Sequence, residues 1–323
     1  MTKKIILIIV LILAIMGISK LTGGSEDIND GPNKNSQQAF LDINLKTNTS
    51  ISSIPLEEVL GGGPLKDGIP AIIEPKFIPV ADAIEVEEGE RFGISVTVGE
   101  TSRFYPYSIL VWHEIVNDVI EEQDVLVTFC PLCGSGIVFD STGKTFGVSG
   151  KLWQSNLLMY DHETETLWSQ SIGTAVVGEK TGEKLDIFPS QLISFDEFSE
   201  KHPDGEVLSR DTGHKRDYTV YPYGDYDTNE NLIFPVTVND NRFATKEIMY
   251  IVGIGNKSVA FKRSDLISEG TAVVDVDGQN ITASVDGSEI EVKDTEGNII
   301  PGYHEMWFSW ATHHQEDGVV WSR

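Results

Sequence analysis

The chain has 323 residues, of which 40% are hydrophobic and 9% aromatic, so it can bury the core of one or two domains and is not intrinsically disordered. It carries 24 lysines and arginines against 50 aspartates and glutamates, which gives a formal charge of −26. A surface this acidic repels phosphate backbones, which excludes nucleic acid as an expected partner.

The first 21 residues have the pattern of a targeting segment. Lys3 and Lys4 precede an uncharged apolar run from Ile5 to Ile18. A helix of that length spans about 21 Å, less than the roughly 30 Å of a hydrocarbon core. The length therefore favours a cleaved signal peptide over a signal anchor, which would be a transmembrane helix. Either form places the body outside the cytoplasm, secreted or membrane-anchored, with membrane contact through this segment only. Residues 22–53 are rich in small polar residues and predict a flexible tether.

From residue 54 onward, short β-branched and alternating runs lie between turn residues. They predict a mainly β fold (β-rich α+β), sandwich-like or barrel-like, with few short helices. The turn dipeptides Asp277-Gly278, Asp286-Gly287 and Glu296-Gly297 predict a series of hairpins near the end. The expected strands include 93–98, 125–129, 136–140, 144–148 and 156–160, and the expected helices are 56–60, 107–116 and 195–201.

The sequence contains an internal similarity. The segment 99–110 aligns with 255–266, and we also align the turn Thr142-Gly143 with Asp277-Gly278 and Trp168 with Trp307. This predicts two related β modules, 54–200 and 245–323. Between them, 201–244 is an insertion with a Ser-Arg-Asp-Thr-Gly loop and a Pro-Tyr-Gly-Asp-Tyr-Asp loop. Only the first module has cysteines, so we expect the function there.

Those cysteines form the motif Cys130-Pro131-Leu132-Cys133-Gly134, which we call the knuckle. Two thiols at this spacing suit a metal, a redox-active disulfide or a structural clip. Because the chain has no other cysteine, a metal would need histidine or carboxylate ligands as well. A thioredoxin-type site needs a helix after the first cysteine, whereas residues 136–140 predict a strand.

His113 is the histidine that the sequence favours as a third ligand. It adjoins Glu114 and precedes the knuckle by about one short helix and one strand. Thiolate and imidazole together suit copper or zinc. We therefore predict a metal or redox site of Cys130, Cys133 and His113, with copper or zinc as the possible cofactor.

Several stretches of this sequence are similar to one known family. They include Trp-His-Glu-Ile-Val-Asn-Asp at 112–118, Phe-Cys-Pro-Leu-Cys-Gly-Ser-Gly at 129–136, Ser-Asn-Leu-Leu-Met-Tyr-Asp at 155–161 and Leu-Ser-Arg-Asp-Thr-Gly at 208–213. Together they resemble domain of unknown function 3179, a group of prokaryotic and mostly exported proteins without an agreed activity. The resemblance covers about residues 75–320, and the pair His313-His314 departs from its pattern.

The resemblance also points to polar residues that are costly to bury unless they are paired, and that would form a pocket around the knuckle. Three functions follow as hypotheses: a metal-binding module, a thiol-disulfide oxidoreductase using Cys130 and Cys133, and a structural envelope protein. The sequence names no protein partner. The expected pocket residues are Glu114, Asn117, Asp118, Ser155, Asn156, Asp161, His162, Arg210 and Asp211.

Overall fold

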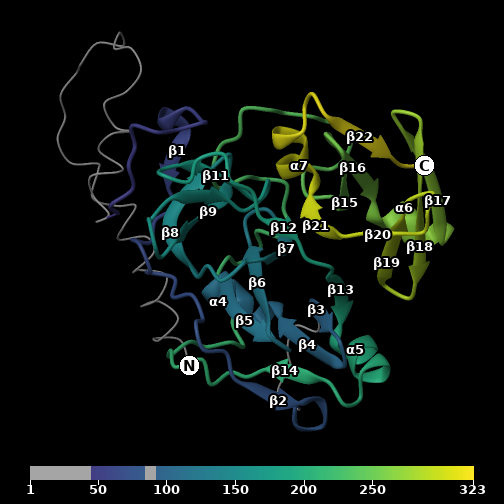
Figure 1. Cartoon of the computed structure of the whole chain (residues 1–323), viewed down its shortest axis with the longest axis horizontal. Helices are drawn as coiled ribbons and strands as arrows, with labels where there is room; N and C mark the ends of the chain where they lie inside the picture. Colours follow the sequence, from purple (N-terminus) through teal and green to yellow (C-terminus); the bar gives the residue numbers. More distant parts are fainter. Residues whose placement is uncertain (1–44, 84–91) are drawn as a thin grey trace.

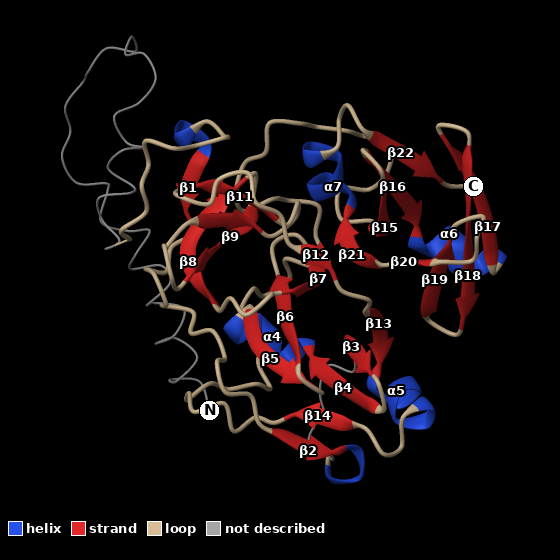
Figure 2. Cartoon of the chain, in the orientation of Figure 1, coloured by secondary structure: helices blue, strands red, loops and turns tan. Residues whose placement is uncertain are grey.

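The computed structural model describes residues 45–83 and 92–323. Four sheets and four short helices make up this part of the chain, and no sheet closes into a barrel (Figures 1 and 2). The β-rich, sandwich-like prediction is therefore confirmed. The helices are α4 (Tyr107–His113), α5 (Phe195–Lys201), α6 (Arg263–Glu269) and α7 (Trp307–His313), with 3-10 turns η1 (Leu56–Glu58) and η2 (Val80–Asp82).

The longest sheet joins the two halves of the chain. Its strand order is β22-β16-β15-β21-β7-β6-β5, and β12 also pairs with β7. The link between the halves is narrow, because β21 and β7 share one paired position, His304 opposite Gly136. The bounds are β5 (Ile115–Ile120), β6 (Gln123–Cys130), β7 (Ser135–Asp140), β12 (Asp186–Ile187), β15 (Ile248–Ile254), β16 (Lys257–Lys262), β21 (Gly302–Met306) and β22 (Gly318–Trp321).

Three smaller sheets surround this one (Figure 1). The first has the order β1-β8-β9-β10-β11, from β1 (Val59–Gly61), β8 (Phe146–Trp153), β9 (Asn156–Asp161), β10 (Leu167–Ser169) and β11 (Thr174–Val177). The second has the order β13-β3-β4-β14-β2, from β2 (Phe77–Pro79), β3 (Phe92–Val98), β4 (Thr101–Pro106), β13 (Gln191–Ser194) and β14 (Glu206–Leu208). The third is β17 (Thr271–Val276), β18 (Gln279–Asp286), β19 (Glu289–Lys293) and β20 (Ile299–Ile300).

Burial patterns explain where each strand lies. Every residue of β9 is buried, as expected of a strand covered on both faces. In β17, by contrast, buried Ala272, Val274 and Val276 alternate with exposed residues, so this strand has one face in solvent. Helix α5 begins at its predicted residue because the Ser194 side chain accepts a hydrogen bond from the Glu197 N–H at 3.2 Å.

The internal repeat is present in the structure. The run β3-β4-α4-β5-β6 over residues 92–130 and the run β15-β16-α6-β17-β18 over 248–286 have the same element lengths at a constant offset. We call them the first and second repeat. Each repeat is also flanked by a strand-helix-strand segment. In the first repeat β13 and β14 pair with β3 and β4, and in the second repeat β21 and β22 pair with β15 and β16. The aligned segments 99–110 and 255–266 therefore lie at equivalent places in two runs of the same elements, while the wider modules 54–200 and 245–323 stay a prediction.

Two of the proposed equivalences inside the repeat are wrong. At the constant offset, Asp277-Gly278 corresponds to Glu121-Glu122, both pairs being hairpin turns with positive φ, and does not correspond to Thr142-Gly143. Trp168 lies in β10 whereas Trp307 begins α7, so these tryptophans are not counterparts. Turn and aromatic residues recur in any hairpin-rich chain, which makes them weak markers of register.

The domain boundaries at 54, 201 and 245 stay a prediction. The signal segment 1–21 and the tether up to residue 44 lie outside the described residues. The rest of the predicted tether, residues 45–53, contacts the folded body. Thr47 donates a hydrogen bond to the Glu165 carbonyl, and the Ser53 N–H donates one to the Val176 carbonyl. In the ranges 45–83 and 92–323, no helix has the length and apolar character needed to cross a membrane.

Candidate functional site

The knuckle is the loop between β6 and β7. Cys130 ends β6, and the loop turns back through a hydrogen bond from the Cys133 N–H to the Cys130 carbonyl at 3.1 Å. Gly134 has φ +55°, and a Cβ there would lie 3.0 Å from Met306 Cε. Only glycine combines this backbone with such close packing, so the Gly of the motif sets the direction in which the chain leaves the turn.

Both knuckle sulfurs are free thiols inside the core. Cys130 is 2% exposed and Cys133 is fully buried, and their side chains hydrogen-bond to each other. Burial alone would raise the pKa of Cys130, but the Cys133 side chain and the N–H groups of Leu157, Cys133 and Leu132 hold that pKa below its usual value. Burial and the neighbouring Cys130 raise the pKa of Cys133 well above normal. Of the two sulfurs, Cys130 is therefore the one that loses its proton more readily.

The thiol of Cys133 faces a strained turn. Its sulfur donates a hydrogen bond to the Ser155 carbonyl at 3.4 Å. Gln154 and Ser155 form the two-residue turn between β8 and β9, and both have positive φ, 53° and 65°, although neither is glycine. The buried Ser155 hydroxyl has no hydrogen-bond partner among the described residues. Unusual backbone and an unsatisfied polar atom next to a reactive group are features that concentrate at functional sites.

A buried carboxyl group accompanies each sulfur. On the Cys130 side, burial and the charge of Cys130 raise the pKa of Glu114 well above normal, and its side chain hydrogen-bonds to Tyr223. On the Cys133 side lies Glu305 of β21, whose pKa burial raises to about 7. Each sulfur of the knuckle thus has a buried carboxyl group nearby, and burial favours the neutral form of both carboxyls.

A loop from the predicted insertion covers the knuckle. Tyr226 is 3% exposed, and its hydroxyl donates to the Leu132 carbonyl at 2.8 Å. Tyr223, in the same loop, hydrogen-bonds to Glu114. Lys246 holds this loop in place, because its ammonium donates to the Tyr226 carbonyl and lies 3.4 Å from the centre of the Tyr226 ring. The Pro-Tyr-Gly-Asp-Tyr-Asp loop is thus a cover of the dithiol.

Ser155 and Asn156 are the other predicted pocket residues near the sulfurs. The Asn156 amide donates to Gln170 Oε1 at 2.9 Å and to Ser135 Oγ at 3.3 Å, while its oxygen accepts the Ser171 N–H. Gln170 in turn donates to Thr128 and to the Ser135 carbonyl. This closed network fixes β9 and β10 against the strands that hold the knuckle.

The structure places His113, Asn117 and Asp118 in other contacts. His113 is buried, with Nδ1 2.7 Å from the Pro70 carbonyl and Nε2 2.7 Å from the Tyr218 hydroxyl. The Asn117 side chain bridges the backbone of Ile72 and Phe146. Asp118 binds Arg103 at 2.8 Å and accepts a hydrogen bond from Tyr105. Each of these groups is satisfied by structural partners.

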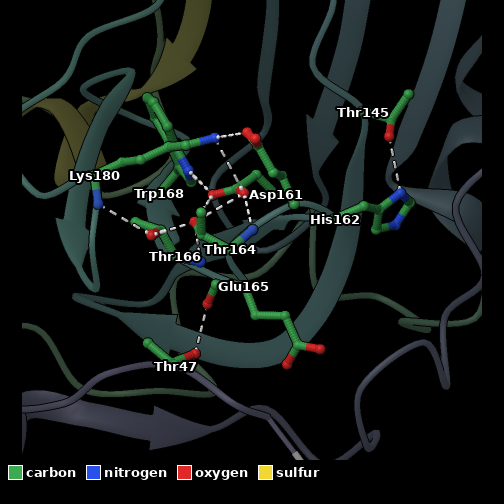
Figure 3. Close-up of polar contacts among 10 residues, drawn as sticks. Thr47, Thr145, Asp161, His162, Thr164, Glu165, Thr166, Trp168 and Lys180 are labelled. Carbon is green, nitrogen blue, oxygen red and sulfur yellow. Dashed lines mark hydrogen bonds and ion pairs between the residues drawn. The ribbon is translucent and has the colours of Figure 1, made fainter.

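Asp161 and His162 form a separate cluster, which Figure 3 shows. Asp161 accepts hydrogen bonds from the Trp168 indole at 2.9 Å and the Thr164 N–H at 2.7 Å, and Lys180 lies 3.5 Å from it. Burial would raise the pKa of Asp161, but these partners hold it below normal. The His162 ring contacts Thr145 Oγ1 at 3.0 Å, and the imidazole itself is exposed. The cluster closes the turn between β9 and β10.

The last two predicted residues lie on a surface loop. Asp211 pairs with Lys76 at 2.6 Å, and both side chains are mostly exposed. Arg210 lies beside it and is half-buried. Within the described ranges, no group of three or more histidine, cysteine, aspartate or glutamate side chains is placed to hold a metal ion.

Sequence reasoning missed most of the groups around the sulfurs that lie far along the chain. These are Tyr223, Tyr226, Glu305 and Ser309. The side chain of Ser309 hydrogen-bonds to Cys133, and it lies four residues after Glu305, in the first turn of α7. An isolated Glu-x-x-x-Ser carries no signal until the fold brings it to the knuckle.

A family model described as a protein of unknown function, DUF3179, matches residues 66–299, more than two thirds of the chain. No curated protein matches the chain, and no solved structure does. The match spans the knuckle, the predicted insertion at 201–244 and all of the second repeat. The chain is thus a member of the DUF3179 family of proteins of unknown function.

Proposed function

We propose that the protein is a thiol-disulfide redox protein in which Cys130 and Cys133 cycle between dithiol and disulfide. The observation that supports this most is the unequal hydrogen bonding of the two sulfurs. The backbone N–H groups of Leu157, Cys133 and Leu132 lower the pKa of Cys130, whereas the Cys133 sulfur donates a hydrogen bond to the Ser155 carbonyl. A thiolate is the nucleophile in disulfide exchange, and a neighbouring thiol resolves the product.

The reaction has two steps. The Cys130 thiolate attacks one sulfur of a low-molecular-mass disulfide, forms a mixed disulfide and releases the other sulfur as a thiolate. Cys133 then loses its proton and attacks Cys130 Sγ, which closes the protein disulfide and releases the second thiolate. The small disulfide gains two electrons, and the protein dithiol loses them. A small reactant suits this site, because the sulfurs lie beneath the loop of Tyr223 and Tyr226.

The metal-binding hypothesis has less support from the geometry. Zinc sites in proteins usually have four ligands, and copper sites usually add histidine or thioether to thiolate. Both ring nitrogens of His113 are engaged by Pro70 and Tyr218, so this residue offers no lone pair to the knuckle. Glu114 interacts with Cys130 and Glu305 with Cys133, and no third histidine, cysteine or carboxyl group joins them in a metal-holding cluster within the described residues.

The test is a redox titration of the full chain. Protein equilibrated with glutathione buffers of graded potential is acid-quenched, alkylated and weighed by mass spectrometry. We expect one two-electron transition between about −300 and −120 mV, the range of exchange-active pairs. Cys130→Ser and Cys133→Ser serve as paired controls, and only Cys133→Ser should accumulate a mixed disulfide. A dithiol that stays reduced throughout, or purified protein that retains stoichiometric zinc or copper, would contradict the proposal.

We also propose that the protein works outside the cytoplasm. The lysine-flanked apolar run Ile5 to Ile18 supports this, and extracytoplasmic compartments supply the oxidants that dithiol cycling requires. A reporter that is active only after translocation, fused after residue 60, should be active. Activity of a cytoplasm-dependent reporter at the same position would argue against export.

A further inference from the structure

Glu305 is a buried acid with one satisfied and one unsatisfied oxygen. Its Oε1 accepts hydrogen bonds from Ser309 Oγ at 2.6 Å and from Ser171 Oγ at 2.7 Å. Its Oε2 has no hydrogen-bond partner among the described residues. Glu305 itself is fully buried. A carboxyl group in this position has a free site for a proton, and the two hydroxyls can transfer that proton in either direction.

The two serines connect Glu305 to different places. Ser309 lies on α7 and hydrogen-bonds to the Cys133 sulfur. Ser171 follows β10 and lines a cleft of about 480 Å³, together with Tyr303 and His313. A continuous chain of polar atoms therefore leads from Cys133 through Ser309, Glu305 and Ser171 to the cleft.

The electrostatic surroundings of Glu305 suit proton transfer. The titratable groups that interact with it are Cys133, from the knuckle, and Tyr303, from its own strand. Burial raises the pKa of Glu305 to about 7, despite the stabilising hydrogen bonds from Ser309 and Ser171. The acid therefore changes protonation state near neutral pH, which is the condition for efficient general acid-base work at that pH.

We propose that Glu305 is the proton acceptor for Cys133 and that Ser171 returns the proton to solvent in the cleft. This inference rests on the proposed redox function. When the disulfide closes, the Cys133 thiol turns from the Ser155 carbonyl to Ser309 Oγ and gives it a proton, while Ser309 passes its own proton to the Glu305 carboxylate. The electron pair left on Cys133 forms the bond to Cys130 Sγ, and the mixed disulfide bond breaks to release the small molecule as a thiolate. When the disulfide is reduced, the same groups return the proton to Cys133. Glu305 is a positioning and proton-transfer group that never bonds to sulfur.

The test follows disulfide closure in time. The Cys130 mixed disulfide with glutathione is formed, and its conversion to the internal disulfide is measured between pH 5 and 9 in the full chain. We expect the wild-type rate to rise through neutral pH. In Glu305→Gln, which keeps both serine hydrogen bonds, closure should slow by about 100-fold at pH 7 and the step near neutral pH should disappear. Glu305→Asp should restore part of the rate.

Two further variants keep the result decisive. Ser171→Ala leaves Glu305 in place and cuts its link to the cleft, so it should slow closure at least several-fold even if Glu305→Gln folds poorly. Glu291→Gln, a half-exposed carboxyl on β19, should leave both rate and pH profile unchanged. An unaltered pH profile in Glu305→Gln would overturn the relay while leaving the redox function intact. Failure of the wild type to form any disulfide would overturn both.

Discussion

Glu114 and Gly270 occupy the same position in the two repeats, and both have a left-handed backbone. Their φ values are 59° and 75°. Each ends its helix with a hydrogen bond from its own N–H, to Leu110 at 2.6 Å and to Leu266 at 2.9 Å. Glycine is the usual residue at this helix end because it has no Cβ to strain the left-handed conformation. The first repeat keeps a glutamate there, and its carboxyl lies beside Cys130.

This comparison predicts that Glu114 is kept at a cost to stability. Glu114→Gly should raise the free energy of unfolding by about 1 kcal/mol, since it removes left-handed strain and a buried acid. It should also slow the reaction of Cys130 with small disulfides. The matched control is Gly270→Ala, which should lower stability by about 1 kcal/mol and leave Cys130 unaffected. Thermal unfolding and stopped-flow kinetics measure the two effects; a destabilised Glu114→Gly protein would contradict the argument.

We expect the Tyr226 hydroxyl to control access to the sulfurs. Tyr226→Phe removes the hydrogen bond to Leu132, worth about 1 kcal/mol, and so makes local opening of the covering loop easier. Alkylation of the native dithiol by iodoacetamide should then accelerate about 5-fold. Tyr250→Phe is the matched control, because it removes a comparable bond, to Ile290, in the second repeat. Equal acceleration in both variants would mean that global unfolding exposes the sulfurs.

Asp161 is predicted to stabilise the fold without taking part in thiol chemistry. Asp161→Asn weakens the bonds to Trp168 and Thr164 and removes the charge facing Lys180 (Figure 3). The free energy of unfolding should fall by about 2 kcal/mol. Glu163→Gln, which removes an exposed partner of the same lysine, should cost about 0.5 kcal/mol or less. Neither variant should shift the midpoint of the redox titration. A shifted midpoint in Asp161→Asn would show that Asp161 does influence the thiol pair.

His113 should make the fold sensitive to acid. Burial lowers its pKa to about 4, with His214 and Arg216 adding to the effect and the Pro70 carbonyl opposing it. Because the folded pKa lies below the unfolded value near 6.5, its contribution to stability is complete above pH 6.5. That contribution is lost as the pH falls toward 4, by at most about 3 kcal/mol. The stability difference between wild type and His113→Gln should therefore shrink over this range. Chemical denaturation at several pH values measures it, and a constant difference would contradict the assignment.

The elements were predictable where local sequence decides them. Ser194 and Glu197 form a capping pair, and helix α5 has the predicted bounds. The hairpin turns with Asp-Gly and the strands around the knuckle also follow from local pattern. Helix α7 was not predicted, because Trp307 to His313 is apolar and aromatic and carries no turn or cap signal.

The site was predictable only in part, for a physical reason. Cys130, Cys133 and Glu114 are close in sequence and lie together in space. Tyr226 and Glu305 reach the knuckle through long-range packing that no local pattern encodes. His113 follows from the motif, but its ring is turned toward Pro70 and Tyr218, and spacing alone does not give the direction of a side chain.

The narrow link between β21 and β7 has a consequence for how the site is assembled. Met306 donates its N–H to the Cys133 carbonyl at 2.8 Å, and Glu305 precedes it, so the C-terminal half completes a centre whose cysteines lie in the N-terminal half. The connecting segment 209–247 contains no helix or strand. A backbone break there would divide the molecule into two fragments, neither with a whole centre. Reactivity would return only on their reassociation, so this fold is suited to fragment complementation with the thiol pair as its own reporter.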